Sequence, residues 1–199
     1  MILEGDWASF KADSTRQLAG GSVLLANPFM EDPNFRRSVV LLVEHSDEHG
    51  SMGFIINKPL EVRLSEITLE FSALPAPLFF GGPVQLDTLH FIHRLGATYF
   101  GESLVVKDDV YWGGDIQTLQ ERTVSGEVDI TCIRFFVGYS GWSKTQLDWE
   151  FENNSWIVTD VTAEQIFDYP PATMWQEILK SISDRHAFIA NLPENPRSN

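Results

Sequence analysis

The segment from 130 to 137 is the longest candidate for a central strand, and it leads directly into the sequence GYSGW at positions 138–142. Glycine allows a positive φ and lets another backbone approach closely, so this composition predicts a shaped loop at the end of a strand. Loops held by a rigid sheet often carry function. This segment contains no general base, no pair of metal ligands and no phosphate cradle. It therefore indicates a binding surface more strongly than a catalytic centre.

Two further apolar runs, 39–43 and 52–56, lie on either side of a polar segment of hairpin length, 44–50. This spacing predicts that the two runs pair as antiparallel strands. Shorter apolar stretches bounded by Gly, Pro and Asn predict additional strands. These shorter strands are expected at 22–26, 78–80, 89–92, 104–106, 110–112 and 156–158.

Helix signals are strongest in the last third of the chain. Thr162 and Gln165 have the spacing of a capping box. A stripe of apolar residues follows between Trp175 and Ile182 at helical spacing. Three weaker signals predict a helix over 116–122 capped by Asp115, one helical turn at 64–67, and a short helix around Trp7 and Phe10.

The size and composition fit one α+β domain, with short strands before residue 160 and helices around them. The chain has 199 residues, of which 43% are hydrophobic and 12% aromatic, enough for a substantial core. We expect an N-terminal extension over 1–17, a domain over 18–190 and a polar tail over 191–199.

The charge of the chain limits its partners. Fourteen basic residues stand against 28 acidic ones, for a net charge of −14, which disfavours direct binding of nucleic acid. No apolar stretch is long enough for a membrane span, and Met1–Lys11 does not resemble a signal peptide. We therefore expect a cytoplasmic protein without a membrane partner. The single cysteine, Cys132, lies in an apolar run and is expected to be a small buried residue.

Several histidines could hold a metal ion. His45 and His49 flank two acidic residues, but they lie in a predicted turn, where Asp, Ser and Gly are common for backbone reasons. His90 and His93 would point to opposite faces of a strand, which argues against a shared ligand role. We expect no metal and no cofactor.

Two other patterns match catalytic motifs only in part. Ser140 would need a glycine at position 142 to form a nucleophile elbow, and this chain has Trp142 there. No clear helical periodicity follows it in 143–147. The Gly-Gly-Pro-Val segment at 81–84 is better explained as a tight turn, because Pro83 has no N–H to offer a phosphate.

The positions that remain are polar or turn residues at predicted strand ends. If they converge in space, they line a cleft of backbone groups and aromatic surface, which suits the binding of a small molecule or peptide better than catalysis. The predicted ligand or partner site consists of Asn27, Pro28, His45, Asn57, Pro59, Gly82, Pro83, Gly138, Tyr139, Gly141 and Trp142.

Four separated motifs carry a family resemblance. They read LLANPFMEDPNFRR at 24–37, SVVLLVEHSDEHGSMGFIINKP at 38–59, GGPV at 81–84 and GYSGWSKTQL at 138–147. In sequence and order they resemble the YqgE/AlgH family of bacterial proteins, over roughly residues 18–185. Two departures matter. Ser140 stands where the family usually has alanine, which weakens the nucleophile interpretation, and the family pattern does not require His49.

The resemblance implies a single α+β domain with a bifurcated, partly barrel-like, mainly antiparallel β-sheet surrounded by helices. It implies no established activity and no agreed metal, cofactor or catalytic residues. The name AlgH reflects a proposed role in regulating alginate production, and some family members are named transcriptional regulators on that basis.

Three functional hypotheses stay open. The first is a non-enzymatic binding or regulatory protein that acts through an unknown protein or small-molecule partner. The second is a hydrolase-like or transferase-like enzyme with a site near 138–142 and His45 or His90 as its general base. The third is a purely structural role for the glycines and aromatics of this segment, in which case truncating Trp142 destabilises the protein strongly.

Overall fold

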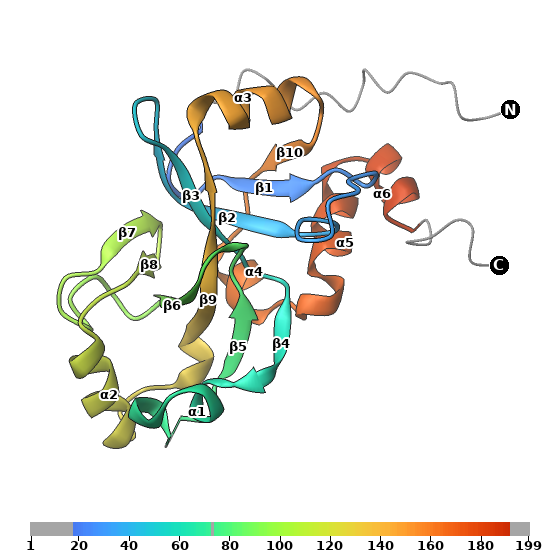
Figure 1. Cartoon of the computed structure of the whole chain (residues 1–199). Helices are drawn as coiled ribbons and strands as arrows, with labels where there is room; N and C mark the ends of the chain where they lie inside the picture. The colour runs from blue at the N-terminus through green and yellow to red at the C-terminus, as the bar shows by residue number, and fades with distance from the viewer. Residues whose placement is uncertain (1–17, 73, 192–199) are drawn as a thin grey trace, which may run out of the picture.

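The computed structural model describes residues 18–72 and 74–191 (Figure 1). The helix predicted around Trp7 and Phe10, and the tail beyond residue 191, lie outside this part of the chain. The strands are β1 (Val23–Ala26), β2 (Val39–Ser46), β3 (Gly50–Ile55), β4 (Pro59–Arg63), β5 (Pro77–Phe80), β6 (Val84–His93), β7 (Leu104–Lys107), β8 (Val110–Trp112), β9 (Ile133–Trp142) and β10 (Trp156–Thr159). The helices are α1 (Leu64–Ile67), η2 (Leu69–Phe71), α2 (Ile116–Val124), η3 (Ile130–Cys132), α3 (Lys144–Glu152), α4 (Ala163–Asp168), α5 (Pro171–Ile182) and α6 (Asp184–Ala190).

The strands of the described chain form one mainly antiparallel sheet that branches at β9. The main order is β10-β1-β2-β3-β9-β6-β8-β7, while β5 pairs in parallel with β9 and carries β4 on its other edge. The far end of the sheet curls back until β7 contacts β2, without closing a barrel. This confirms the predicted α+β class with a bifurcated, partly barrel-like sheet.

The predicted hairpin of 39–43 with 52–56 is confirmed. β2 and β3 pair antiparallel, with Leu41 opposite Phe54, and a bulge lies between Leu42 and Glu44. The apolar run is uninterrupted because both faces of β2 are buried: Val39 and Leu41 pack in one core cluster, and Val40 and Leu42 in another.

The prediction of a loop at 138–142 is wrong, because β9 continues through these residues. On one edge Ser140 lies opposite Gly53 and Trp142 opposite Ser51, while on the other edge Tyr139 lies opposite Val84. The beginning of this strand also differs from the prediction. Residues 130–132 form the short helix η3, and Cys132 is partly exposed rather than buried.

Gly138 allows two backbones to cross within a continuous strand. The connection between β5 and β6 passes over β9 at Gly138, whose φ is +65°. A Cβ at this position would lie 2.6 Å from the carbonyl oxygen of Gly82 and 2.8 Å from that of Val84. The crossing is held by Ser140, whose Oγ donates to the Gly81 carbonyl at 3.0 Å. Only glycine permits this approach.

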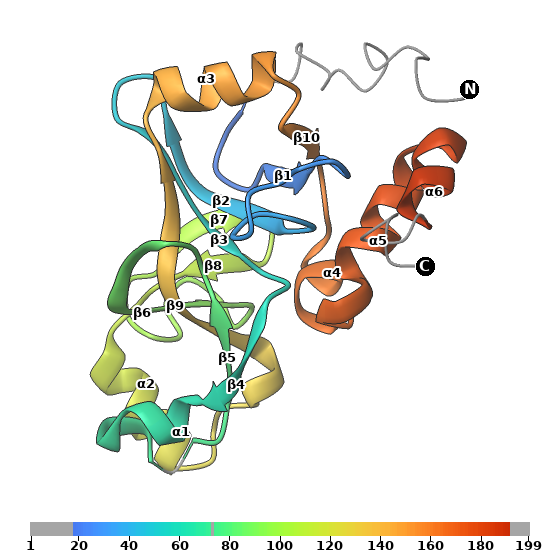
Figure 2. The same cartoon turned by 45° about the vertical axis from the view of Figure 1, so that its right-hand side comes forward.

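Helices cover the sheet on three sides (Figures 1 and 2). α4, α5 and α6 lie together along one side, α3 lies across the end of β3 and β9, and α1 and α2 lie at the opposite end. Several predictions are confirmed: Asp115 caps α2, Thr162 and Gln165 form the capping box of α4, and α5 buries Trp175. No helix in residues 18–72 or 74–191 combines the length and apolarity needed to cross a bilayer.

α3 was not predicted, because it lacks an apolar stripe. Leu147 is its one buried residue. The helix begins at Ser143, whose Oγ accepts the Gln146 N–H at 3.2 Å. The first residue of the helix, Lys144, forms an ion pair of 2.8 Å with Asp47 in the β2–β3 turn. Polar contacts therefore position this helix.

Replacing Gly138 with alanine should destabilise the protein more than the same change at Gly126. Both glycines have positive φ, but a Cβ at Gly126 would meet no atom within 4 Å. We expect Gly126→Ala to lower the free energy of unfolding by about 1–2 kcal/mol from backbone strain. Gly138→Ala should lose a further 1–3 kcal/mol, roughly, from overpacking. Urea denaturation followed by circular dichroism measures both, and equal losses would contradict the backbone crossing.

Candidate functional site

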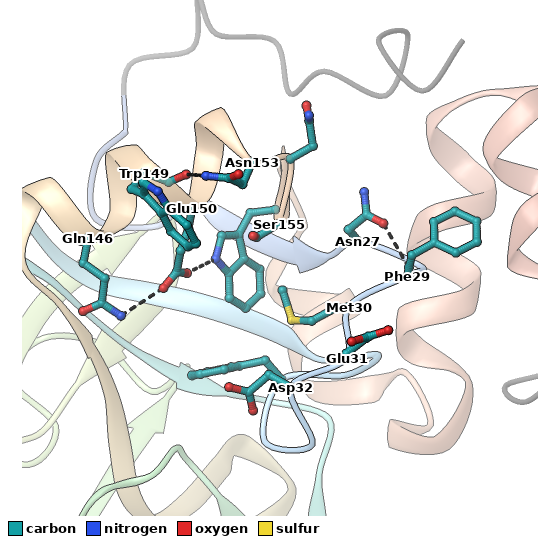
Figure 3. A pocket seen from close by; sticks show the side chains of 13 residues that line it. Asn27, Phe29, Met30, Glu31, Asp32, Gln146, Trp149, Glu150, Asn153 and Ser155 are labelled. Carbon is teal, nitrogen blue, oxygen red and sulfur yellow. Dashed lines mark hydrogen bonds between the residues drawn. The ribbon is translucent and has the colours of Figure 1, made fainter. Parts of the chain in front are cut away.

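An open groove with a volume of about 960 Å³ lies between α3 and the segment that follows β1 (Figure 3). Gln146, Trp149 and Glu150 of α3 lie on one side of it, and the 27–32 segment lies on the other. Two of its floor residues, Phe35 and Trp156, pack edge to face at 5.4 Å. The residues that line the groove are Asn27, Phe29, Met30, Glu31, Asp32, Phe35, Gln146, Trp149, Glu150, Asn153, Asn154, Ser155 and Trp156.

The α3 wall is fixed by one carboxylate. Glu150 Oε2 accepts a hydrogen bond from Trp142 Nε1 at 2.9 Å and another from Trp156 Nε1 at 2.6 Å. Its Oε1 accepts from Gln146 Nε2 at 2.9 Å. Three donors from β9, β10 and α3 itself therefore meet at this side chain, which holds the helix at a set angle over the sheet.

The opposite wall is braced by local hydrogen bonds. Asn27 Oδ1 accepts the Phe29 N–H at 2.9 Å, and Asp32 Oδ1 accepts the Asn34 N–H at 2.8 Å. Lys58 Nζ donates to the Asn34 carbonyl at 2.7 Å. These contacts preserve the shape of a loop that has no strand partner.

The groove exposes aromatic and acidic side chains together. The Phe29 side chain is 51% exposed and that of Trp149 61%, one on each wall. Glu31 and Asp32, on the same wall as Phe29, are also exposed. No Lys, Arg or His is among the lining residues. The arrangement can hold an apolar or cationic group by contact. Its lining contains no Cys, His or Lys that could act as a nucleophile or base.

The predicted site residues do not gather in this groove. Asn27 is the member of the predicted set that lines it. Gly82, Gly138 and Tyr139 meet at the backbone crossing described above. Trp142 is 4% exposed and lies beneath the groove, with its ring 5.6 Å from that of Phe35.

The other predicted residues are dispersed. Asn57 is buried and ties two backbone groups together: its Oδ1 accepts the Val39 N–H at 2.8 Å and its Nδ2 donates to the Arg37 carbonyl at 2.9 Å. His45 Nδ1 is 2.8 Å from Ser51 Oγ on the neighbouring strand. Three of the remaining members lie at the ends of strands: Pro28 after β1, Pro59 at the start of β4 and Pro83 before β6. The last one, Gly141, lies within β9.

The histidines of β6 lie in separate environments. His90 lines a second, smaller groove of about 520 Å³ together with Trp112, and no Ser, Thr, Cys or Lys lines it. Burial lowers the pKa of His90, so the ring is neutral near pH 7. His93 packs against Phe100 in a different core cluster. The two rings therefore do not form a joint site.

His93 is a buried structural histidine. Its Nε2 is 3.0 Å from Ser103 Oγ, which donates its own hydrogen to the Gly113 carbonyl at 2.9 Å. The Nε2 must therefore carry the ring hydrogen, while Nδ1 accepts the Leu95 N–H at 3.4 Å. With this assignment Ser103 is a hydrogen-bond acceptor, so the pair is not an activated nucleophile. In residues 18–72 and 74–191, no three His, Cys, Asp or Glu side chains gather as metal ligands.

The residues that sequence reasoning missed lie on α3 and in the segment after Asn27. One signal was available: Ser143 and Gln146 have the spacing of a capping box. Read as a helix start, this pair places Gln146, Trp149 and Glu150 on one face. No local pattern indicates that this face lies opposite Glu31, because the two segments are more than a hundred residues apart.

The sequence matches a known family. The model of the AlgH-like family matches residues 23–187. A UPF0301 protein of Cytophaga hutchinsonii is 39% identical over 182 residues, which cover 92% of this chain and 100% of that protein. A UPF0301 protein of Chlorobaculum tepidum is 41% identical over 182 residues, which cover 92% of this chain and 96% of the other.

Two solved structures share the fold. The solution structure of the AlgH protein from Pseudomonas aeruginosa matches with a TM-score of 0.66 at 26% identity, covering 89% of this chain and 98% of that one. A crystal structure of a protein from Corynebacterium diphtheriae matches with a TM-score of 0.77 at 20% identity, covering 96% of this chain and 100% of that one. The second likeness concerns the fold alone.

Trp142 and Trp149 should differ sharply in their effect on stability. Trp142 is buried and bonded to Glu150, so Trp142→Ala should lower the free energy of unfolding by about 3–5 kcal/mol. Trp149 is mostly exposed, and Trp149→Ala should change it by less than about 1 kcal/mol. Urea denaturation of the two variants tests this. A small loss for Trp142→Ala would favour an exposed, functional role for that side chain.

The stability of the protein should fall in mild acid because of His93. Burial lowers the pKa of His93 from 6.5 to about 4, so the folded state holds it neutral while the unfolded state takes up a proton. This contribution is complete above pH 6.5 and is lost as the pH falls toward 4, about 2 kcal/mol of it by pH 5.

Urea denaturation near neutral pH and near pH 5 measures this loss, and His93→Gln should make the pH dependence shallower. Burial also lowers the pKa values of His90 and His186. Both residues are present in the parent protein and in His93→Gln, so the difference between the two pH curves reports on His93. Parallel pH curves for the parent and the variant would show that His93 does not titrate in this way.

Proposed function

The chain belongs to the AlgH-like family, and from that premise we propose that it is a non-enzymatic binding protein that holds a segment of a protein partner in the groove beside α3. The observation that carries the proposal is the pair of exposed aromatic side chains, Phe29 and Trp149, on opposite walls of a braced groove. Exposed aromatic residues in a concave site are the usual anchors of protein interfaces.

The walls of the groove are already held in place by hydrogen bonds, so little of the groove has to become ordered when a partner binds. Glu150 fixes one wall through its contacts with two tryptophans, and Asn27 and Asp32 fix the other through their own backbone. A preformed groove loses less conformational entropy when a partner binds. Its length along α3 and its open shape suit an extended segment better than an enclosed metabolite.

The chemistry of the lining residues favours binding over catalysis. Glu150 is the partly buried carboxylate of the groove, and both of its oxygens already accept hydrogen bonds. The lining residues include no His, Cys or Lys. Three donors already hold Glu150, which favours a structural role for this carboxylate over that of a general base.

The partner that we propose is a protein rather than a nucleic acid. The net charge is −14, and the groove adds carboxylates without any basic side chain. Such a surface repels phosphate groups. Any regulatory effect of this protein would then follow from occupying a segment of another protein.

Trp149→Ala should weaken binding at the groove by at least about tenfold, as expected for a tryptophan anchor. The probes are three short, fluorescein-labelled peptides in which Leu alternates with Lys, with Gln or with Glu. Fluorescence anisotropy gives the affinity of each, and the side-chain amide signals of Gln146 and Asn153 in NMR spectra show whether the groove is occupied. At least one peptide should shift these signals.

Val124→Ala is the matched control, because Val124 is 75% exposed and lies on α2, outside the groove. It should leave all affinities unchanged. If none of the three peptides shifts the groove signals, or if Trp149→Ala has no larger effect than Val124→Ala, the proposal is wrong.

A further inference from the structure

The carboxylates of the groove differ in what they contact. Glu150 is occupied by three donors, as described above. The Glu31 side chain is exposed and forms no hydrogen bond or ion pair with residues 18–72 or 74–191. Asp32 uses one oxygen, Oδ1, for the Asn34 N–H, and its Oδ2 has no partner in the same part of the chain. Two carboxylates therefore face the groove with acceptor capacity left over.

Two basic residues near these acids, Lys58 and Arg37, have contacts elsewhere. Lys58 Nζ donates to the carbonyls of Pro33 and Asn34, behind the loop. The Arg37 guanidinium lies over the ring of Trp175, 5.2 Å from its centroid. Neither side chain lines the groove. The carboxylates of the groove therefore have no basic side chain beside them among the lining residues.

Trp149 provides a second surface for a cation. Its ring is 61% exposed on the opposite wall. An ammonium or guanidinium group placed over the face of a tryptophan is attracted by the ring quadrupole, and this effect adds to the attraction of nearby carboxylates. Met30 and Phe35 add partly exposed apolar surface to the groove, and Phe35 packs on the buried ring of Trp156.

Resting on the proposed function, we infer that the partner segment carries a Lys or Arg next to an apolar side chain. The apolar side chain contacts Met30 and Phe35. The cation lies between Trp149 and the carboxylates of Glu31 and Asp32. The net charge of −14 contributes a long-range attraction for the same class of segment. Acidic segments are rejected by the same groups.

The test removes the two unoccupied charges while keeping their shape. In Glu31→Gln/Asp32→Asn, the new side chain at 32 can still accept the Asn34 N–H. The affinity for the Leu–Lys peptide should fall about threefold to tenfold, since each exposed charge contact is worth a few tenths to one kcal/mol. The affinity for the Leu–Gln peptide should not change. The Leu–Lys peptide should also lose affinity as NaCl is raised from about 50 to about 300 mM.

The control is Asp108→Asn/Asp109→Asn, which removes the same charge from the exposed β7–β8 turn, outside the groove. It should leave the affinity for the Leu–Lys peptide within twofold, roughly, of the parent value. An equal loss in both double variants would overturn the inference, because it would reflect the net charge alone.

The inference and the proposed function fail in different ways. If the Leu–Gln and Leu–Lys peptides bind equally well, and both weaken in Trp149→Ala, the groove is a binding site without preference for a cation, and only the inference is overturned. If the affinity of every peptide is insensitive to Trp149→Ala, the groove is not the site, and both are overturned.

Discussion

The fold depends on β9, which is shared by both branches of the sheet. One of its edges pairs with β6, while the other pairs with β5 at 135–137 and with β3 at 140–142. Gly138, with a φ of +65°, lies between the residues that pair with β5 and those that pair with β3. The β5–β6 connection then passes over the same residue. The two halves of the core are joined at this crossing.

Elements whose determinants are local could be predicted from the sequence. The β2–β3 hairpin follows from two apolar runs and a polar turn, and α4 follows from the Thr162–Gln165 capping box. The segment at 138–142 could not be placed in this way. Glycine serves both turns and close backbone approaches, and the crossing segment that distinguishes them lies more than fifty residues earlier in the chain.

The residues of the candidate site were harder to predict than the fold, for a related reason. Polar residues at strand ends are candidates for a binding surface, but Asn57 is buried, with its amide bonded to the backbone of Val39 and Arg37. Residue type and local pattern do not reveal which polar groups the fold itself requires. The groove arises where α3 faces a loop more than a hundred residues earlier, so its lining is a product of packing.

The orientation of α3 about its own axis determines which of its side chains line the groove. Successive residues on a helix point about 100° apart. Once Glu150 is turned inward to the indole nitrogens of Trp142 and Trp156, Trp149 lies about 100° further round the helix, at the exposed edge of the same wall. The buried tryptophan therefore sets the direction of the exposed one. Trp142 of the 138–142 segment is 4% exposed and does not line the groove. It still affects the groove, because its bond to Glu150 helps to set which residues of α3 face it.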